Sequence, residues 1–214
     1  MQTEAIKPMK LAHFVVKTTK YKEVVNWYQN VLGMQITAAS PAATFLYFDD
    51  EHHRMAVLNL PGLLPNWRGA AGVDHVAFTY DSVSSLLQNY ERLKAMGIEP
   101  VWPVNHGATL SFYYKDPDGN VIELQVDVFE SREETNAFLE DGRFAINPIG
   151  IDVDPNDLLA RWKQGASHEE LTAWPDVVEP RREPPPAAYL GGFAATMLKL
   201  GLSLIHISEP TRPY

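Results

Sequence analysis

Apolar and polar positions follow the same layout twice along this chain. The first copy opens with an apolar run at residues 11–16 and continues into a helical repeat over residues 21–32, which Gly33 ends. Three short strand-like runs follow, at residues 34–37, 44–48 and 54–60. The pattern predicts one strand, one helix and three further strands, in this order.

The second copy repeats this order. Residues 73–78 indicate a strand, Asp81 or Ser82 can cap the helix that follows, and Gly97 ends that helix. We expect the apolar face of this helix to consist of Leu86, Leu87, Tyr90, Leu93 and Met96. Strand-like runs follow at residues 98–101, 110–114 and 121–126. His13 and His75 thereby fall at equivalent positions, which indicates an internal duplication.

The chain changes character after residue 126. Ser131 and Ser167 each begin a capping box, and Asp154 precedes a proline that suits the first turn of a helix. Residues 180–186 include three consecutive prolines, which predict an extended arm. We therefore expect short helices around the core in this part of the chain.

These patterns predict an α+β fold, in which two paired βαβββ modules form a cupped mixed sheet and a helical extension follows. The expected parts are an N-terminal arm (1–8), a first module (9–62), a second module (63–128), a helical and proline-rich extension (129–200) and a tail (201–214). The tail resembles an in-frame translation of a sequencing adapter and is interpreted as non-native.

Charge and composition narrow the class of protein. The chain has 18 Lys and Arg against 27 Asp and Glu, a net charge of −9, and no basic cluster offsets it, so nucleic acid is not an expected partner. It has no cysteine, which excludes disulfides, thiolate zinc sites and cysteine nucleophiles. No apolar run is as long as a membrane span, and the N-terminus has no apolar signal core. A cytoplasmic location without membrane contact is therefore expected.

Three polar residues, His13, His75 and Glu123, interrupt apolar runs where burial is expected. An unpaired imidazole or carboxylate in an apolar interior is costly, whereas one that binds a divalent cation is compensated. If the two modules pair about a pseudo-twofold axis, both histidines meet at one point, and Glu123 completes a 2-His-1-carboxylate site. Such a site binds non-haem Fe(II) and leaves coordination positions open for a substrate and O2.

The other histidines divide into two groups. His168, at an expected helix start, and His206, in the tail, are interpreted as ordinary residues without a chemical role. The adjacent pair His52 and His53, together with His106, are candidates for a role at the site.

The residues around His106 match a known signature. The run from Val104 to Glu123 has His106, Tyr113 and a turn at residues 116–119 at fixed spacing. It resembles the signature of extradiol ring-cleavage dioxygenases of the vicinal oxygen chelate superfamily, which also contains glyoxalases and bleomycin resistance proteins.

The resemblance covers about residues 9–127, and the C-terminal extension is more loosely similar to that of small, one-domain members that act on dihydroxybiphenyl-type substrates. It implies that the chain cleaves the ring of a catechol-type aromatic diol with O2 as co-substrate. His13, His75 and Glu123 are similar to the family's iron ligands, so Fe(II) is the implied cofactor. The same ligands accept Mn(II).

The resemblance also implies roles around the metal. His53 resembles the family's acid–base histidine near O2, and His52 has the weaker claim to that role. His106 and Tyr113 resemble residues that hydrogen-bond the substrate hydroxyls, and Tyr113 is expected to be a donor rather than a base. Trp67, in a Gly- and Pro-rich connection, is a candidate wall of the pocket for an aryl substrate.

Two other functions compete within the superfamily, a glyoxalase-like metal-dependent isomerase or lyase and a non-catalytic small-molecule-binding protein. Glyoxalase-like sites use a fourth ligand from the last strand of the first module. Laying that strand beside the last strand of the second puts Val57 opposite Glu123, and Val57 cannot bind a metal. A three-ligand site is therefore favoured. We also expect a homo-oligomer, because paired modules expose sheet edges, and the sequence leaves open which catechol is cleaved.

Overall fold

The chain forms two units in the computed structural model, which describes residues 5–67, 70–181 and 183–191. The first unit consists of Met1–Asn66 together with Asp116–Gly119, and the second of Trp67–Lys115 with Asn120–Tyr214. The expected non-native tail, residues 201–214, lies outside the described residues.

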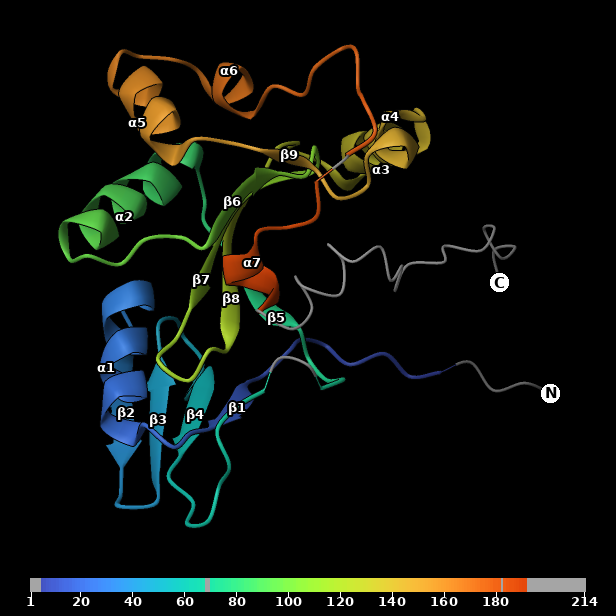
Figure 1. The fold of residues 1–214 in the computed structure, drawn as a ribbon. Coiled ribbons are helices and arrows are strands. Elements are labelled where there is room, and N and C mark those ends of the chain that lie inside the picture. Colours follow the sequence, from blue (N-terminus) through green and yellow to red (C-terminus); the bar gives the residue numbers. More distant parts are fainter. Residues whose placement is uncertain (1–4, 68–69, 182, 192–214) are drawn as a thin grey trace. The chain divides into compact units, whose positions relative to one another are not determined.

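The first unit contains one βαβββ module. Its elements are β1 (Phe14–Lys17), α1 (Tyr21–Leu32), β2 (Gln35–Ala39), β3 (Ala43–Tyr47) and β4 (Met55–Leu58). The sheet order is β1-β4-β3-β2, with β1 parallel to β4 and the other neighbours antiparallel (Figure 1). Strand β1 therefore forms one edge of this sheet.

Helix α1 has the bounds that the sequence pattern predicts. Its buried side chains are Val24, Val25, Tyr28 and Val31. These positions repeat with the helical period and form one apolar face. The helix ends because Gly33 takes a left-handed conformation with φ of 65°, which side-chain-bearing residues rarely adopt.

The second unit repeats the module and extends its sheet. Its module consists of β5 (His75–Thr79), α2 (Val83–Ala95), β6 (Trp102–Asn105), β7 (Thr109–Lys115) and β8 (Val121–Asp127). The sheet order is β5-β8-β7-β6-β9, where the short strand β9 (Ile151–Asp152) comes from the extension. Strand β5 is parallel to β8, as β1 is to β4, which confirms the duplicated βαβββ order.

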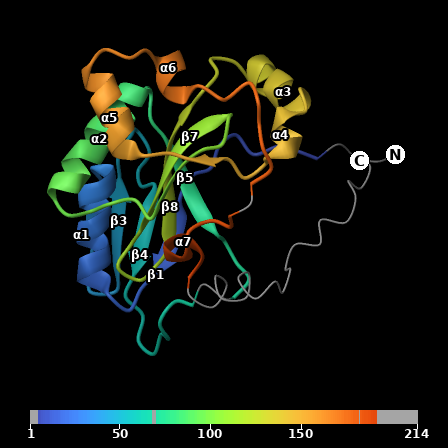
Figure 2. The same ribbon diagram turned by 45° about the horizontal axis from the view of Figure 1, so that its top comes forward.

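The extension after β8 is helical, as expected. It contains α3 (Arg132–Glu140), α4 (Arg143–Ile146), α5 (Pro155–Lys163), α6 (His168–Thr172) and α7 (Ala187–Leu190). Both predicted capping boxes are present, at Ser131 and Ser167, and Asp154 caps α5 through the amide of Asn156. Helix α5 lies beside α2 (Figure 2), where the Tyr90 hydroxyl donates a hydrogen bond to Asn156 Oδ1 at 2.8 Å.

The turn between β7 and β8, Asp116–Gly119, belongs to the first unit. Asp118 accepts hydrogen bonds from the backbone amide of Thr19 at 2.8 Å, from the Thr19 hydroxyl at 3.0 Å and from the Thr18 hydroxyl. These bonds hold the segment between β1 and α1, and they lower the pKa of Asp118 although burial raises it.

The predicted helix face in the second unit is right except at its end. Leu86, Leu87, Tyr90 and Leu93 are buried, but Met96 is 47% exposed. Met96 is the C-cap of α2, and its amide bonds back to the carbonyl of Leu93 at 3.0 Å. It therefore lies where the helix ends and its apolar face no longer continues.

The strand predicted at residues 98–101 is wrong, because the strand in this place is β6 at Trp102–Asn105. The amides of Gly97 and Ile98 still bond to the carbonyls of Lys94 and Leu93, so the chain needs several more residues to leave the helix. Pro103 within the strand weakens its sequence signal.

The first strand also begins later than predicted. Strand β1 starts at Phe14 rather than at residue 11, so His13 precedes it and is exposed within its unit. The expectation that His13 lies inside a buried strand is therefore wrong, since the apolar residues before it do not join the sheet.

Among the described residues, no helix has both the length and the apolar character needed to cross a membrane.

Candidate active site

The second unit brings His75 and Glu123 together. Strands β5 and β8 are parallel neighbours, with His75 opposite Val121 and Ala77 opposite Glu123. His75 and Ala77 are two residues apart on β5, so their side chains share a face of the sheet. Glu123 pairs with Ala77 and therefore projects from that same face. His75 Nε2 lies 3.1 Å from Glu123 Oε2.

The other nitrogen of His75 is held by its neighbour in the chain. His75 Nδ1 lies 2.8 Å from Asp74 Oδ2, and because a carboxylate only accepts, Nδ1 carries the proton and donates it. The hydrogen bond to Glu123 raises the pKa of His75, burial opposes this, and Asp74 adds to the increase. The imidazole is thus fixed between two carboxylates, with Nε2 directed at the buried one.

Glu123 is only 5% exposed, as its place in an apolar strand predicts. Burial raises its pKa, but hydrogen bonds from His75 and Ser111, together with the charges of His75 and His106, outweigh burial, and the net pKa is below the ordinary value. A buried carboxylate and an imidazole nitrogen that face each other at hydrogen-bond distance are the donors that a divalent iron or manganese ion accepts. The carboxylate behind His75 matches the common pattern in which a second carboxylate orients a metal-binding histidine. These residues therefore fit a metal of this kind.

The third predicted ligand, His13, belongs to the first unit and precedes β1. Among the described residues, no three His, Asp or Glu side chains gather closely enough to form a complete metal-binding group. The complete set of three ligands stays a prediction.

Tyr113 and His106 lie beside this pair in the second unit. Tyr113 on β7 is directly opposite Glu123 on β8, and His106 Nε2 lies 3.0 Å from the Tyr113 hydroxyl. His106 Nδ1 lies 2.6 Å from the carbonyl oxygen of Ile149, which can only accept. Nδ1 therefore carries the proton, and Nε2 of the neutral ring is an acceptor.

The surroundings set the charge states of these two residues. Burial lowers the pKa of His106, which favours its neutral form. Burial and the nearby carboxylate of Glu123 raise the pKa of Tyr113 above its ordinary value. Tyr113 therefore keeps its proton near neutral pH and can donate a hydrogen bond, and its role toward a substrate stays a prediction.

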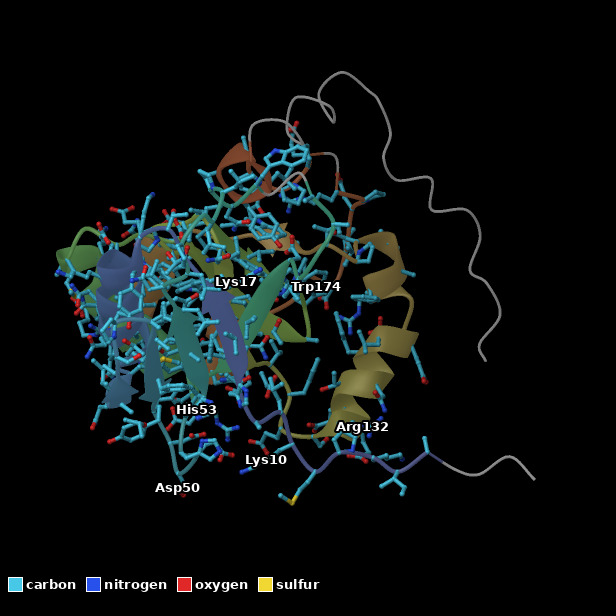
Figure 3. The ribbon with its side chains drawn as sticks, turned by 90° about the horizontal axis from the view of Figure 1, so that it is seen from below. Lys10, Lys17, Asp50, His53, Arg132 and Trp174 are labelled. Carbon is cyan, nitrogen blue, oxygen red and sulfur yellow. The ribbon has the colours of Figure 1, made fainter. Side chains whose placement is uncertain are left out.

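A cluster of three histidines lies in the first unit. The His13 and His53 ring centroids are 4.4 Å apart, and the Nδ1 atoms of His52 and His53 are 2.5 Å apart. His53 lies in the β3–β4 connection (Figure 3) and also contacts the ring of Phe45. The His52 side chain is 67% exposed, so it is His53 that packs against the predicted ligand.

The prediction that Val57 is the counterpart of Glu123 in the first module is wrong. Phe14 pairs with Met55 on β4, and Val76 pairs with Ile122 on β8, so Ala56, not Val57, is the counterpart of Glu123. Laying the two strand sequences side by side displaces the match by one residue, because it does not use the register of each strand with its parallel neighbour. Alanine has no metal-binding group either, so the three-ligand interpretation is unaffected.

Trp67, which is predicted to line a pocket, is 63% exposed, and its role stays a prediction.

Three other groups contact the histidines of the site and are not among the predicted residues. Asp74 has a sequence signal, because it is the acidic neighbour of His75. The carbonyl of Ile149 and the hydroxyl of Tyr189 have no such signal, because they are far along the chain from His106 and Asp74, with which they form hydrogen bonds.

Comparison with known proteins assigns the family. The family profile of the Glyoxalase/Bleomycin resistance protein/Dioxygenase superfamily matches residues 10–124. The chain belongs to this superfamily. The match spans both modules and contains all three predicted metal ligands, and it confirms the fold class expected from the sequence.

Two curated relatives come from Rhodococcus globerulus. Biphenyl-2,3-diol 1,2-dioxygenase 2 is 39% identical over 179 residues, which is 80% of this chain and 94% of the relative. Biphenyl-2,3-diol 1,2-dioxygenase 3 is 40% identical over 169 residues, which is 77% of this chain and 89% of the relative. Among solved structures, lactoylglutathione lyase from Agrobacterium tumefaciens aligns with a TM-score of 0.42 and 20% identity, over 56% of this chain and 94% of its own.

Proposed function

We propose that this protein is a metal-dependent extradiol dioxygenase, which opens the ring of a catechol-type, dihydroxybiphenyl-like diol with O2. The observation that carries the proposal is the pair formed by His75 Nε2 and the buried Glu123, with the Tyr113 hydroxyl and neutral His106 beside it. Relatives of about 40% identity that are named biphenyl-2,3-diol 1,2-dioxygenases support it.

His13, His75 and Glu123 would hold the metal, Fe(II) or Mn(II). When bound, a ferrous ion lowers the pKa of the diol hydroxyls and supplies the redox chemistry that O2 requires. Asp74 holds the protonated Nδ1 of His75. Once Nε2 loses the proton that it donates to Glu123, its lone pair would be available for coordination.

His106 and Tyr113 would bind and orient the diol. In its neutral form His106 accepts a hydrogen bond at Nε2, because Nδ1 is committed to the Ile149 carbonyl. A diol hydroxyl can therefore donate to this nitrogen or transfer its proton there. Tyr113 keeps its own proton, since burial raises its pKa, and it can donate a hydrogen bond to a substrate oxygen.

His53 would serve as the acid–base group near O2. Burial and the neighbouring His13 and His52 lower its pKa, so the free enzyme holds it mostly neutral at pH 7. A neutral imidazole first has to take up a proton before it can donate one. The second hydroxyl of the diol is the source that the reaction itself provides.

A glyoxalase-like isomerase and a non-catalytic binding protein are the competing functions. The isomerase interpretation requires a fourth ligand at the position of Ala56, which has none. A protein that binds small molecules without a metal has no need of a buried carboxylate facing an imidazole at 3.1 Å. The dioxygenase is therefore the function that the site supports best.

The test is to load the protein with Fe(II) under anaerobic conditions, add biphenyl-2,3-diol or catechol, and then admit air. We expect uptake of one O2 per diol and a yellow ring-opened product, faster with the bicyclic diol. Metal-loaded protein that consumes no O2 with either diol would overturn the proposal. Formation of an isomerised thiol ester from a hemithioacetal would instead support the glyoxalase-like function.

Two variants separate the proposed roles. Glu123→Ala should lose bound iron, because it removes a ligand, whereas His53→Ala should keep the iron and lose turnover. Iron content is measured by metal analysis after desalting, and turnover by O2 uptake. Equal loss of iron in both variants would contradict the separation of roles.

A further inference from the structure

Tyr189 lies far along the chain from His75 but packs beside it within the second unit. It is on α7, close to the last described residue, and is 7% exposed. Its ring centroid is 4.8 Å from that of Trp102 and 5.1 Å from that of Tyr113. The apolar cluster that contains it also includes Val104 and Val121 on the sheet. The ring is therefore held rigidly from several sides.

The hydroxyl of Tyr189 reaches the carboxylate behind His75. It donates a hydrogen bond to Asp74 Oδ2, the same oxygen that accepts from His75 Nδ1 at 2.8 Å. The direct distance from the Tyr189 hydroxyl to His75 Nδ1 is 3.5 Å, at the limit of a hydrogen bond. The connection from Tyr189 to His75 therefore runs through Asp74.

The hydrogen bond from Tyr189 restricts the rotamers of Asp74. The Asp74 side chain is 56% exposed, and an exposed carboxylate has several rotamers within reach. A buried tyrosine hydroxyl that donates to one of its oxygens favours the rotamer in which that oxygen also accepts from His75. Through Asp74, Tyr189 thereby restricts the rotation of the His75 imidazole and keeps its Nε2 atom pointing in one direction.

The rest of the extension secures Tyr189 in place. Arg181 donates to Asp152 on β9 from its two terminal guanidinium nitrogens, each at 2.8 Å, and Trp102 Nε1 donates to the same carboxylate at 2.7 Å. Lys115 on β7 donates to the carbonyl of Ala188, next to Tyr189. The segment after β9 is thus fastened to the sheet at two points, Arg181 and Ala188.

We propose that Tyr189 is a positioning residue for metal binding, which acts through Asp74 to hold His75 Nε2 in the orientation that a metal requires. The proposal rests on the proposed function, since it presumes that His75 is a ligand. It extends that function to the C-terminal extension, which then contributes to the metal site as well as to the fold. Partners of this kind typically change metal affinity by about 10- to 100-fold when they are removed.

The test compares Tyr189→Phe with Tyr114→Phe by titration of Co²⁺ into the full-length, metal-free protein in competition with a chromogenic chelator. Tyr114 is the matched control, because it is also a buried tyrosine of this unit, and its hydroxyl has no hydrogen-bond partner among the described residues. Each substitution removes one hydroxyl and keeps the ring. We expect roughly tenfold weaker Co²⁺ binding for Tyr189→Phe and less than a twofold change for Tyr114→Phe.

A double-mutant cycle with Asp74→Ala tests the route. If Tyr189 acts through Asp74, the double variant Asp74→Ala/Tyr189→Phe binds Co²⁺ as weakly as Asp74→Ala alone. Additive losses would show that Tyr189 affects the metal by some other path and would overturn the proposal. Thermal unfolding of the metal-free variants, which should match the parent closely, separates positioning from a general loss of packing.

The outcomes distinguish this inference from the proposed function. Unchanged Co²⁺ affinity in Tyr189→Phe, or equal losses in Tyr189→Phe and Tyr114→Phe, overturns the positioning role alone. A parent protein that binds no Co²⁺, Fe²⁺ or Mn²⁺ overturns the proposed function, and the role of Tyr189 with it.

Discussion

Replacing Gly150 by alanine should disturb the fold and the His106 side of the site together. Gly150 has φ of 110°, in the region that favours glycine. An added methyl carbon would lie 2.5 Å from the carbonyl oxygen of Asn105, 2.8 Å from Val104 Cγ2 and 3.0 Å from His106 Nδ1. Ordinary contacts are about 3.5 Å, so β6 and the segment before β9 would have to move apart.

Two separate costs contribute to the expected loss of stability. The backbone conformation costs an alanine about 1–3 kcal/mol, and overpacking against a backbone carbonyl costs about 1–3 kcal/mol more. Gly165→Ala isolates the first cost, because Gly165 has φ of 93° and an added methyl meets nothing within 4 Å. We therefore expect Gly150→Ala to lower the free energy of unfolding by about 2 kcal/mol more than Gly165→Ala does.

Urea denaturation followed by circular dichroism measures both variants. The relaxation that accommodates the methyl group also moves Ile149, whose carbonyl fixes the proton on His106 Nδ1. Turnover of a diol should consequently fall in Gly150→Ala but not in Gly165→Ala, at temperatures where both are folded. Equal destabilisation of the two variants, together with equal turnover, would refute the close approach of the extension to β6.

Three further predictions concern other parts of the molecule. Asp118→Ala removes the hydrogen bonds to Thr18 and Thr19 and should lower the free energy of unfolding by about 1–3 kcal/mol at pH 7. Because the folded state lowers the pKa of Asp118, its stabilisation is complete above the unfolded-state value near 4 and is lost as pH falls through the folded-state pKa. The difference in urea midpoint between parent and variant should therefore shrink at acid pH, and a constant difference down to pH 2 would contradict this. Tyr113→Phe should keep Fe(II) and lower kcat roughly 100-fold, since it removes a hydrogen-bond donor and no ligand, and loss of iron would argue against that role. Removal of the metal with a chelator should lower the melting temperature of the parent but not of Glu123→Ala, as differential scanning fluorimetry would show.

The amino-acid sequence predicts much of the local structure. The period of Val24, Tyr28 and Val31, followed by Gly33, predicts the bounds of α1, because these signals act within a few residues of one another. The capping boxes at Ser131 and Ser167 are present for the same reason. Where local signals compete, as at β6 with its Pro103, the prediction is displaced.

The predicted pairing of His75 with Glu123 follows from two polar residues that interrupt apolar runs. The parallel pairing of β5 with β8 puts their side chains 3.1 Å apart. The counterpart of Glu123 in the first module is displaced by one residue, because hydrogen-bonded register rather than a side-by-side alignment of the strands decides which positions are equivalent.

The linear order of residues was sufficient for the βαβββ repeat, the helix caps and the buried carboxylate, because each depends on side-chain pattern over short stretches. Only the folded chain revealed that Ile149 fixes the proton on His106 and that Tyr189 secures Asp74, contacts that span 43 and 115 positions. Such contacts depend on how the extension docks on the sheet. Docking is decided by the packing of side chains that are distant in the chain, and no local pattern encodes it.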